Sequence, residues 1–246
     1  MAGLIPALFH GQMLGTVSVC GLDTSQHAPG QFAGRVGLVL QNPANQLSGM
    51  RYTVYEEVAF GLENLGIPRA AMPGRIEHAL AQVGLAELHD RSPYTLSGGQ
   101  QQRMALASIL VLEPAVLLLD EPTAMLDPAG SQAVFEIIHA LVRTGTTVVI
   151  VEHRLEWMGR YAERVLALAE GEVVLDGTPA DVLTSPLLRQ IGVGWLRYTR
   201  AAHLGQKRGL WPDKQALPVT LEQAVTGFQQ AGARPPAEEQ LDADPR

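Results

Sequence analysis

Three short, almost uninterrupted apolar runs stand out along the chain, at residues 36–40, 115–119 and 147–151. Runs of this kind are typical of strands that are buried on both faces of a parallel sheet. Between the last two runs, apolar residues recur at helical spacing after Asp127 and Pro128, a typical helix start. The order strand, helix, strand therefore predicts an α/β fold with a parallel sheet.

Further elements are predicted on the N-terminal side of this core. Residues 16–20 alternate in polarity, which predicts a strand that carries Cys20 as a small buried side chain. An amphipathic helix that Gly84 ends is predicted from one apolar face. That face consists of Ile76, Ala79, Leu80 and Val83.

The C-terminal part has a different character. Residues 173–175 predict an edge strand, and Thr178 starts a short helix through an arrangement similar to a capping box. Thr220 is predicted to cap a helix that runs through Phe228. Residues 234–246 are rich in proline and acidic side chains, which predicts a disordered tail.

Composition narrows the possible classes of protein. The 246 residues are 46% hydrophobic, so we expect a packed core, and no apolar stretch predicts a transmembrane helix or a secretory signal. A single cysteine excludes a disulfide framework. The formal net charge of −7 is the wrong balance for electrostatic capture of nucleic acid.

Polar residues follow each of the three predicted strands. Gln41 follows the first, Asp120 and Glu121 end the second, and His153 follows the third. Ligands of open α/β sheets gather at such strand ends. There a carboxylate can hold Mg²⁺, a second carboxylate can orient or deprotonate a water, and a histidine can bond a γ-phosphate. Gln41 can reach Mg²⁺ or the water, so the set suits phosphoryl transfer to water.

A fourth motif, Ser97-Gly98-Gly99-Gln100, opens a predicted helix. Glycines let backbone N–H groups approach a ligand closely, and a helix N-terminus favours an anion such as phosphate. Each motif alone has a plainer interpretation as a turn or a loop. Their order and spacing argue against coincidence, because 23 residues separate Ser97 from Asp120 and 33 separate Asp120 from His153.

Together these motifs resemble those of the ATP-binding-cassette (ABC) ATPases. Residues 96–103, Leu-Ser-Gly-Gly-Gln-Gln-Gln-Arg, look like the signature motif of that family. Asp120 and Glu121 resemble the Walker B pair, and Gln41 resembles the Q-loop glutamine. His153 resembles the switch histidine, and residues 124–127 resemble the D-loop. A narrower similarity, to the ATPases of energy-coupling-factor importers of vitamins and transition-metal ions, covers residues 41–46, 53–64 and 151–156.

The resemblance implies an α/β, P-loop NTPase-like ABC ATPase core with a parallel sheet. It places the ABC domain at residues 1–190, with a helical subdomain at about residues 50–112 that carries the signature motif. The N-terminal antiparallel β part is expected to be truncated. Residues 191–233 are then a C-terminal extension and residues 234–246 its tail.

The resemblance also implies roles and partners. ATP and Mg²⁺ are the expected cofactors, with Glu121 as the base or water-positioner, Gln41 and His153 as further catalytic residues, and Asp120 and Gln41 as Mg²⁺ ligands. Two cassettes pair head to tail, so a second set contacts the nucleotide in trans. That set is Ser97, Gly98, Gly99, Gln100 and Asp127.

The expected partners are a second ABC ATPase subunit, a transmembrane coupling subunit that faces the segment after Gln41, and a substrate-binding membrane subunit. The expected location is the cytoplasmic face of the membrane. Nucleic acid is not an expected partner. The alternative class is a soluble ABC protein that takes no part in transport. The acidic charge balance favours a transporter over that class. Nothing in the sequence identifies the cargo.

The sequence departs from the family at the P-loop. Neither of its two lysines, Lys207 and Lys214, follows a glycine, so no Walker A motif is present. Residues 2–6 resemble the stretch that follows the P-loop helix. We therefore expect the isolated chain to bind ATP weakly and to hydrolyse none. Either the chain starts too late, or it is a degenerate cassette that lends its signature motif to an intact partner.

Overall fold

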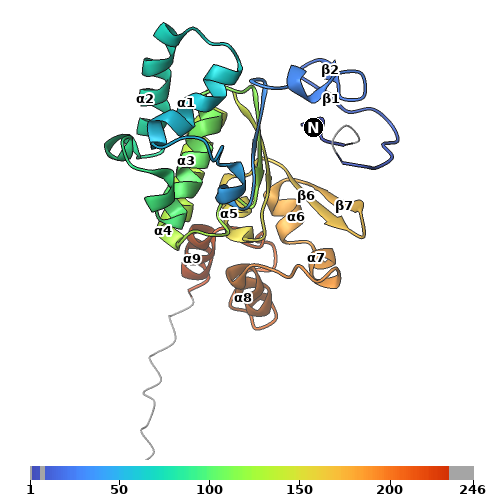
Figure 1. The fold of residues 1–246 in the computed structure, drawn as a ribbon. Coiled ribbons are helices and arrows are strands. Elements are labelled where there is room, and N and C mark those ends of the chain that lie inside the picture. Colours follow the sequence, from blue (N-terminus) through green and yellow to red (C-terminus); the bar gives the residue numbers. More distant parts are fainter. Residues whose placement is uncertain (1, 6–8, 233–246) are drawn as a thin grey trace, which may run out of the picture. The chain divides into compact units, whose positions relative to one another are not determined.

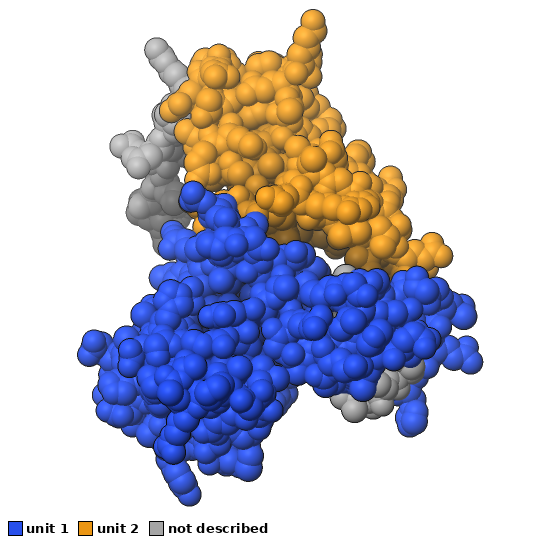
Figure 2. Space-filling model, turned by 90° about the horizontal axis from the view of Figure 1, so that it is seen from above, with its two compact units in different colours: residues 1–153 blue, residues 154–246 orange. Residues whose placement is uncertain are grey.

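The structure is a computed structural model, and it describes residues 2–5 and 9–232. Its chain divides into two compact units, Met1–His153 and Arg154–Arg246, which are coloured separately in Figure 2. Within the described residues, no helix is long and apolar enough to cross a membrane.

The first unit is built on a parallel sheet of three strands. They are β3 (Val36–Val39), β4 (Val116–Asp120) and β5 (Thr147–Val151), in the order β3-β4-β5. Their shared register aligns the carboxyl ends of all three strands at one edge of the sheet. The predicted α/β fold with a parallel sheet is confirmed.

Four α-helices lie between the strands of this sheet along the chain. They are α1 (Val54–Asn64), α2 (Met72–Gln82), α3 (Gly98–Leu110) and α4 (Pro128–Arg143). The first three pack on one another (Figure 1), and α3 also packs against β3. The predicted amphipathic face of α2 is confirmed, because Ile76, Ala79 and Leu80 are all buried.

The sheet is buried on one face rather than on both. Along β3 and β4 the buried side chains alternate with partly exposed ones, and Leu117 and Leu119 point to the buried face. On β5, Val149 and Val151 are 38% and 57% exposed. The expectation of strands buried on both faces was therefore wrong. An apolar run shows that a strand can be buried on both faces, but only the layers that pack on it decide whether it is.

A short hairpin near the N-terminus corrects another expectation. It consists of β1 (Ser18–Val19) and β2 (Leu22–Asp23), paired antiparallel. Cys20 lies in the turn between them with a φ of +52° and is exposed. The predicted strand at residues 16–20 is thus only two residues long, and Cys20 is not a buried side chain. The chain reverses direction there, so the apparent alternation ends.

The second unit combines a hairpin with short helices. Its elements are α5 (Leu155–Tyr161), β6 (Val165–Ala169), β7 (Glu172–Gly177), α6 (Pro179–Leu183), α7 (Pro186–Gln190), α8 (Arg197–Gln206) and α9 (Leu221–Gln230). β6 and β7 are antiparallel. The edge strand and the caps at Thr178 and Thr220 are confirmed, although α9 ends two residues after Phe228. The predicted tail at residues 234–246 lies outside the described residues.

The apolar core of this unit joins segments on both sides of residue 190. Ala167, Val182 and Leu188 pack in one cluster with Leu196 and Val219. The compact unit starts at Arg154. The boundary expected near residue 190, between the ABC domain and a C-terminal extension, stays a prediction.

The first prediction concerns the contact between β3 and α3. Gly37 has no room for a side chain, because a methyl group there would overlap Cγ2 of Ile109. Gly37→Ala should lower the free energy of unfolding by about 1–3 kcal/mol, the usual effect of overpacking a core. Gly74→Ala is the matched control, since Gly74 is exposed within α2 and a methyl group meets nothing within 4 Å. Urea denaturation should show no loss of unfolding free energy for that control. An equal loss of unfolding free energy in both variants would contradict the packing argument.

A second prediction concerns Tyr198, whose Oη donates a hydrogen bond to the carbonyl of Val219 at 3.0 Å. Burial, together with the charges of Glu156 and Glu222, raises the pKa of Tyr198 to about 12. An unfolded tyrosine titrates near 10. Between these values the unfolded chain loses the proton first, so stability is intact below pH 10 and falls as the pH rises towards 12.

Tyr198→Phe should flatten this alkaline loss of stability, measured by chemical denaturation between pH 9 and about 12. Tyr52→Phe is the control, because Tyr52 is 85% exposed. Parallel pH profiles for wild type and Tyr198→Phe would show that Tyr198 does not control the loss.

Candidate functional site

Three side chains from three different strand ends meet at one carboxylate. Nε2 of Gln41 donates a hydrogen bond to Oε2 of Glu121 at 2.9 Å. Nε2 of His153 lies 3.0 Å from the other oxygen, Oε1. The parallel register of β3, β4 and β5 brings these residues together, since each follows the carboxyl end of its strand. The structure thus unites the three residues that the sequence singled out as catalytic.

The backbone of Glu121 is held in an unusual conformation. Its φ is +46°, in the left-handed region that residues other than glycine seldom adopt. Its N–H continues the pairing of β4 with β5 by donating to the carbonyl of Val151 at 2.9 Å. Such conformations cost about 1–3 kcal/mol and gather at functional sites. The side chain of Glu121 is 21% exposed and that of His153 is 81% exposed, so the cluster opens to solvent.

A part-buried contact that sequence reasoning missed ties two of these strand ends together. Thr123 is fully buried, and its Oγ1 donates to Oε2 of Glu152 at 2.7 Å. The other oxygen of Glu152 accepts the backbone N–H of His153 at 3.0 Å. Glu152 therefore holds the segment after Glu121 and the start of the His153 loop in one arrangement. No local pattern could reveal this contact, because its partners are 29 residues apart.

The segment after Gln41 is also shaped by side chains. It forms a 3-10 turn, Pro43–Gln46, and the amide of Gln46 bonds the backbone of both Leu38 and Leu40 at 3.1 and 2.9 Å. Further on, the buried carboxylate of Glu57 accepts the N–H and the hydroxyl of Ser48. These bonds fix the course of the loop between β3 and α1.

The signature-like motif lies at the start of α3. Ser97 and Gln100 bond each other reciprocally as a capping box, with Oε1 of Gln100 accepting the N–H of Ser97 at 2.9 Å. Asp127 caps α4 by accepting the N–H of Gly130 at 2.7 Å. Ser97, Gly99, Gln100 and Asp127 share the wall of one cavity of about 440 Å³. Gly98 is exposed beside them as the first residue of α3.

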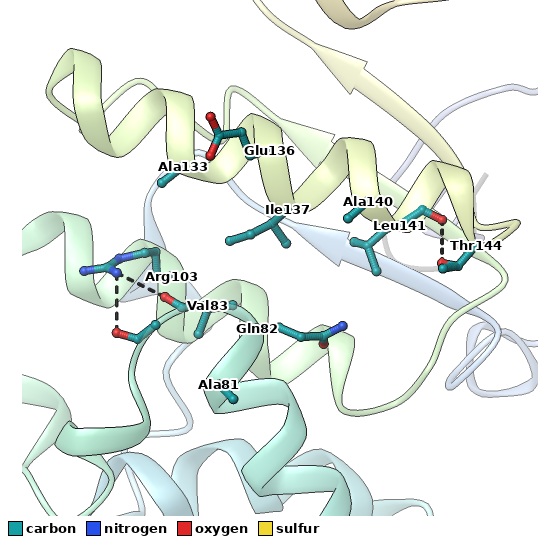
Figure 3. A pocket seen from close by; sticks show the side chains of 11 residues that line it. Ala81, Gln82, Val83, Arg103, Ala133, Glu136, Ile137, Ala140, Leu141 and Thr144 are labelled. Carbon is teal, nitrogen blue, oxygen red and sulfur yellow. Dashed lines mark hydrogen bonds between the residues drawn. The ribbon is translucent and has the colours of Figure 1, made fainter.

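The expected site residues therefore form two groups. One is the Gln41–Glu121–His153 cluster, and the other, the signature group, is Ser97, Gly98, Gly99, Gln100 and Asp127. Within the described part of the chain, no hydrogen bond or ion pair joins the two groups. Arg103, the last residue of the signature run, anchors α3 instead to the end of α2. Figure 3 shows its guanidinium donating to the carbonyl of Val83, at 3.1 Å, beside a groove that α4 also lines.

Asp120 is the donor that fits a divalent cation. It ends β4, next to Glu121, and its side chain is exposed. Gln41 bonds Glu121 through its nitrogen, which leaves its amide oxygen for another partner. Hard oxygen donors of this kind suit Mg²⁺, which keeps several waters and needs few protein ligands. Among the described residues, no cluster of three or more His, Cys, Asp or Glu side chains can hold a metal by itself.

A parallel sheet with polar residues at its carboxyl edge is typical of nucleotide-binding α/β proteins, and the capped glycine-rich start of α3, between β3 and β4, can bind an anion. The model of the ABC transporter family matches residues 4–124. A Pyrococcus horikoshii protein named as an ABC transporter ATP-binding protein is 44% identical over 210 residues, which cover 85% of this chain and 73% of that protein.

Other similarities agree. The energy-coupling factor transporter ATP-binding protein EcfA2 of Symbiobacterium thermophilum is 41% identical, over 87% of this chain and 74% of its own length. Among solved structures, cbiO1 of Clostridium perfringens, part of the ABC transporter complex cbiONQ, is similar with a TM-score of 0.60 and 34% identity, over 72% of this chain and 70% of its own. The ADP-bound dimeric cassette MJ0796 has a TM-score of 0.61 at 27% identity.

The chain therefore belongs to the ABC transporter ATP-binding proteins, a family of ATPases, and resembles the energy-coupling-factor type.

The hydrogen bond from the buried Thr123 to Glu152 leads to a third prediction. Thr123→Val keeps the side-chain volume but removes the donor to a carboxylate, so we expect a loss of about 1.5–3 kcal/mol in the free energy of unfolding. Thr144→Val is the control, because Thr144 is exposed and its hydroxyl donates to the nearby carbonyl of Leu141, not to a carboxylate. That variant should stay within about 0.5 kcal/mol of wild type. Equal unfolding midpoints for wild type and Thr123→Val would refute the contact.

Proposed function

We propose that this chain is the ATP-hydrolysing subunit of an energy-coupling-factor-type importer of a vitamin or metal ion, at the cytoplasmic face of the membrane. The observation that carries the proposal is the meeting of Gln41, Glu121 and His153 at the carboxyl edge of the sheet. The relatives of the energy-coupling-factor and cbiONQ type support the choice of transporter.

In the proposed reaction, Glu121 takes the proton of a water whose oxygen forms a bond to the γ-phosphorus. The bond from that phosphorus to the bridging oxygen breaks, and the released oxygen stays with the diphosphate. ATP would supply the phosphoryl group, and Mg²⁺ bound at this edge would supply positive charge that stabilises the transferred phosphoryl group. Gln41 and His153 hold the Glu121 carboxylate from opposite oxygens, which fixes its direction before the water arrives. Asp120, with the amide oxygen of Gln41, is the proposed ligand for Mg²⁺.

The proposed signature group acts on a second cassette rather than on the Glu121 cluster of its own chain. Its cavity is lined by Ser97, Gly99, Gln100 and Asp127, and no bond ties it to that cluster in the described residues. The exposure of Ser97 and Gly98 at the start of α3 leaves their backbone accessible to a partner's nucleotide. We therefore propose a homo- or heterodimer of ABC subunits.

Membrane subunits are the other proposed partners. Beyond Gln41, Met50 and Tyr52 are 65% and 85% exposed in the segment before α1. Large apolar side chains this exposed, on a loop fixed by Gln46 and Glu57, suit docking of a transmembrane coupling subunit. A substrate-binding membrane subunit would select the cargo.

A second candidate is a degenerate cassette, in which the 246 residues, which contain no Walker A motif, work without a P-loop of their own. A cassette without a P-loop can complete a partner's ATP site with its signature motif and hydrolyse nothing itself. In the first candidate the P-loop comes from a segment outside these residues. The two candidates differ in whether Glu121 matters for turnover.

The fourth prediction separates them. In the complex purified from its native cell through a tag on this chain, Glu121→Gln should lower kcat about 10²–10⁴-fold, as expected for loss of a general base. Glu77→Gln, an exposed carboxylate on α2, is the control and should leave kcat unchanged. Unchanged turnover in the Glu121 variant would select the non-hydrolysing cassette.

The isolated 246-residue chain should show no saturable ATP hydrolysis, because it has no P-loop. Measurable turnover by that chain would contradict this expectation. Purification of the complex without any membrane subunit would contradict the transporter assignment and favour a soluble ABC protein.

A further inference from the structure

Positive charge is concentrated in one segment of the second unit. Residues 182–212 carry five arginine or lysine side chains and no aspartate or glutamate, in a chain whose net charge is −7. The five are Arg189, Arg197, Arg200, Lys207 and Arg208. A local excess of one sign against the overall balance creates a positive potential that attracts anions.

A cavity of about 310 Å³ opens within this basic segment. It lies between the end of α7 and the first turn of α8, and its lining residues are Arg189, Gly192, Gly194, Trp195 and Arg200. Gly192 and Gly194 have φ values of +85° and +86°, a conformation that other residues rarely adopt. These two glycines turn the chain so that Trp195 comes back beneath Arg189.

Trp195, which lines the cavity, is held by contacts on several sides. The indole Nε1 of Trp195 donates to the carbonyl of Ser185 at 2.7 Å, and the ring packs edge-on against His203 at 5.0 Å between centroids. The guanidinium of Arg189 lies over the indole, 5.2 Å from the ring centroid. Stacking on an aromatic ring holds a guanidinium in one plane while its N–H donors stay available at the edge.

Among the residues that the structure describes, no carboxylate pairs with either arginine of this cavity. Elsewhere in the second unit Arg160 pairs with Glu222 and Arg164 pairs with Asp176. In the described part of the chain, Arg189 and Arg200 form no ion pair, and both side chains are exposed at the cavity. Two guanidinium groups that face one cavity repel each other unless an anion lies between them.

We propose that this cavity binds the phosphate group of a compact anion, held between Arg189 and Arg200. Guanidinium groups recognise phosphate oxygens through paired N–H donors. A phosphate has enough oxygens to bond two arginines at once, so it fits between them better than a carboxylate does. The volume is at the lower end of small-molecule sites, so the ligand is small. The source is a free phosphorylated molecule or a phospholipid headgroup. The proposal does not depend on the proposed function, because it uses no residue of the Glu121 cluster.

The test is a calorimetric titration of the full chain with pyrophosphate at fixed ionic strength, which measures the affinity. Arg200→Ala should weaken binding at least tenfold, and Arg200→Lys should retain part of the affinity because the charge remains. Arg208→Ala removes the same charge from the same basic segment but lies outside the cavity, and should change affinity less than twofold. Arg200 is exposed, so the unfolding midpoint of each variant should match wild type and exclude a folding defect.

A parallel measurement identifies the source of the phosphate. Flotation with vesicles that contain phosphatidylglycerol is compared with vesicles of phosphatidylcholine alone. Pyrophosphate binding that needs Arg200, without flotation, supports a free ligand, and flotation that needs Arg200 supports a lipid headgroup. The proposal is overturned if neither ligand binds saturably, or if Arg200→Ala and Arg208→Ala lose affinity equally, since that would show a diffuse charge effect.

Discussion

The structure of the first unit depends on the parallel pairing of β3, β4 and β5. Because the three strands run in the same direction and in one register, their carboxyl ends share an edge of the sheet. Residues 80 positions apart, Gln41 and Glu121, are thereby within hydrogen-bond distance. The Thr123–Glu152 hydrogen bond and the left-handed backbone of Glu121 both lie at this edge, and the hydrogen bond joins the segments that follow β4 and β5.

The two units carry opposite kinds of chemistry. The first presents carboxylates at strand ends, suited to a cation and to a water that must lose a proton. The second presents the guanidinium groups of Arg189 and Arg200, which pair with no carboxylate among the described residues, and these suit an anion. A family defined by its ATP site thus has, in this member, a second polar cavity in the part of the chain that follows the shared motifs.

Local signals in the sequence were sufficient for most elements. Ser97, Asp127, Thr178 and Thr220 begin helices that the sequence predicts, and such caps depend only on residues two or three positions away. Expectations that depended on distant contacts fared less well. Cys20 is exposed because the chain turns there, and β5 is half-exposed because burial of a strand needs a layer on each face.

The sequence by itself determined which chemical groups the protein has and in what order they stand. Gln41, the signature run, Asp120 with Glu121, and His153 are recognisable because a motif is written in consecutive residues. Only the tertiary structure decided that one carboxylate joins Gln41 to His153, that Glu152 links two strand ends, and that Arg189 lies stacked over Trp195. Those contacts join residues far apart in the chain or fixed by a particular turn, and their geometry comes from packing, which no local pattern of residues encodes.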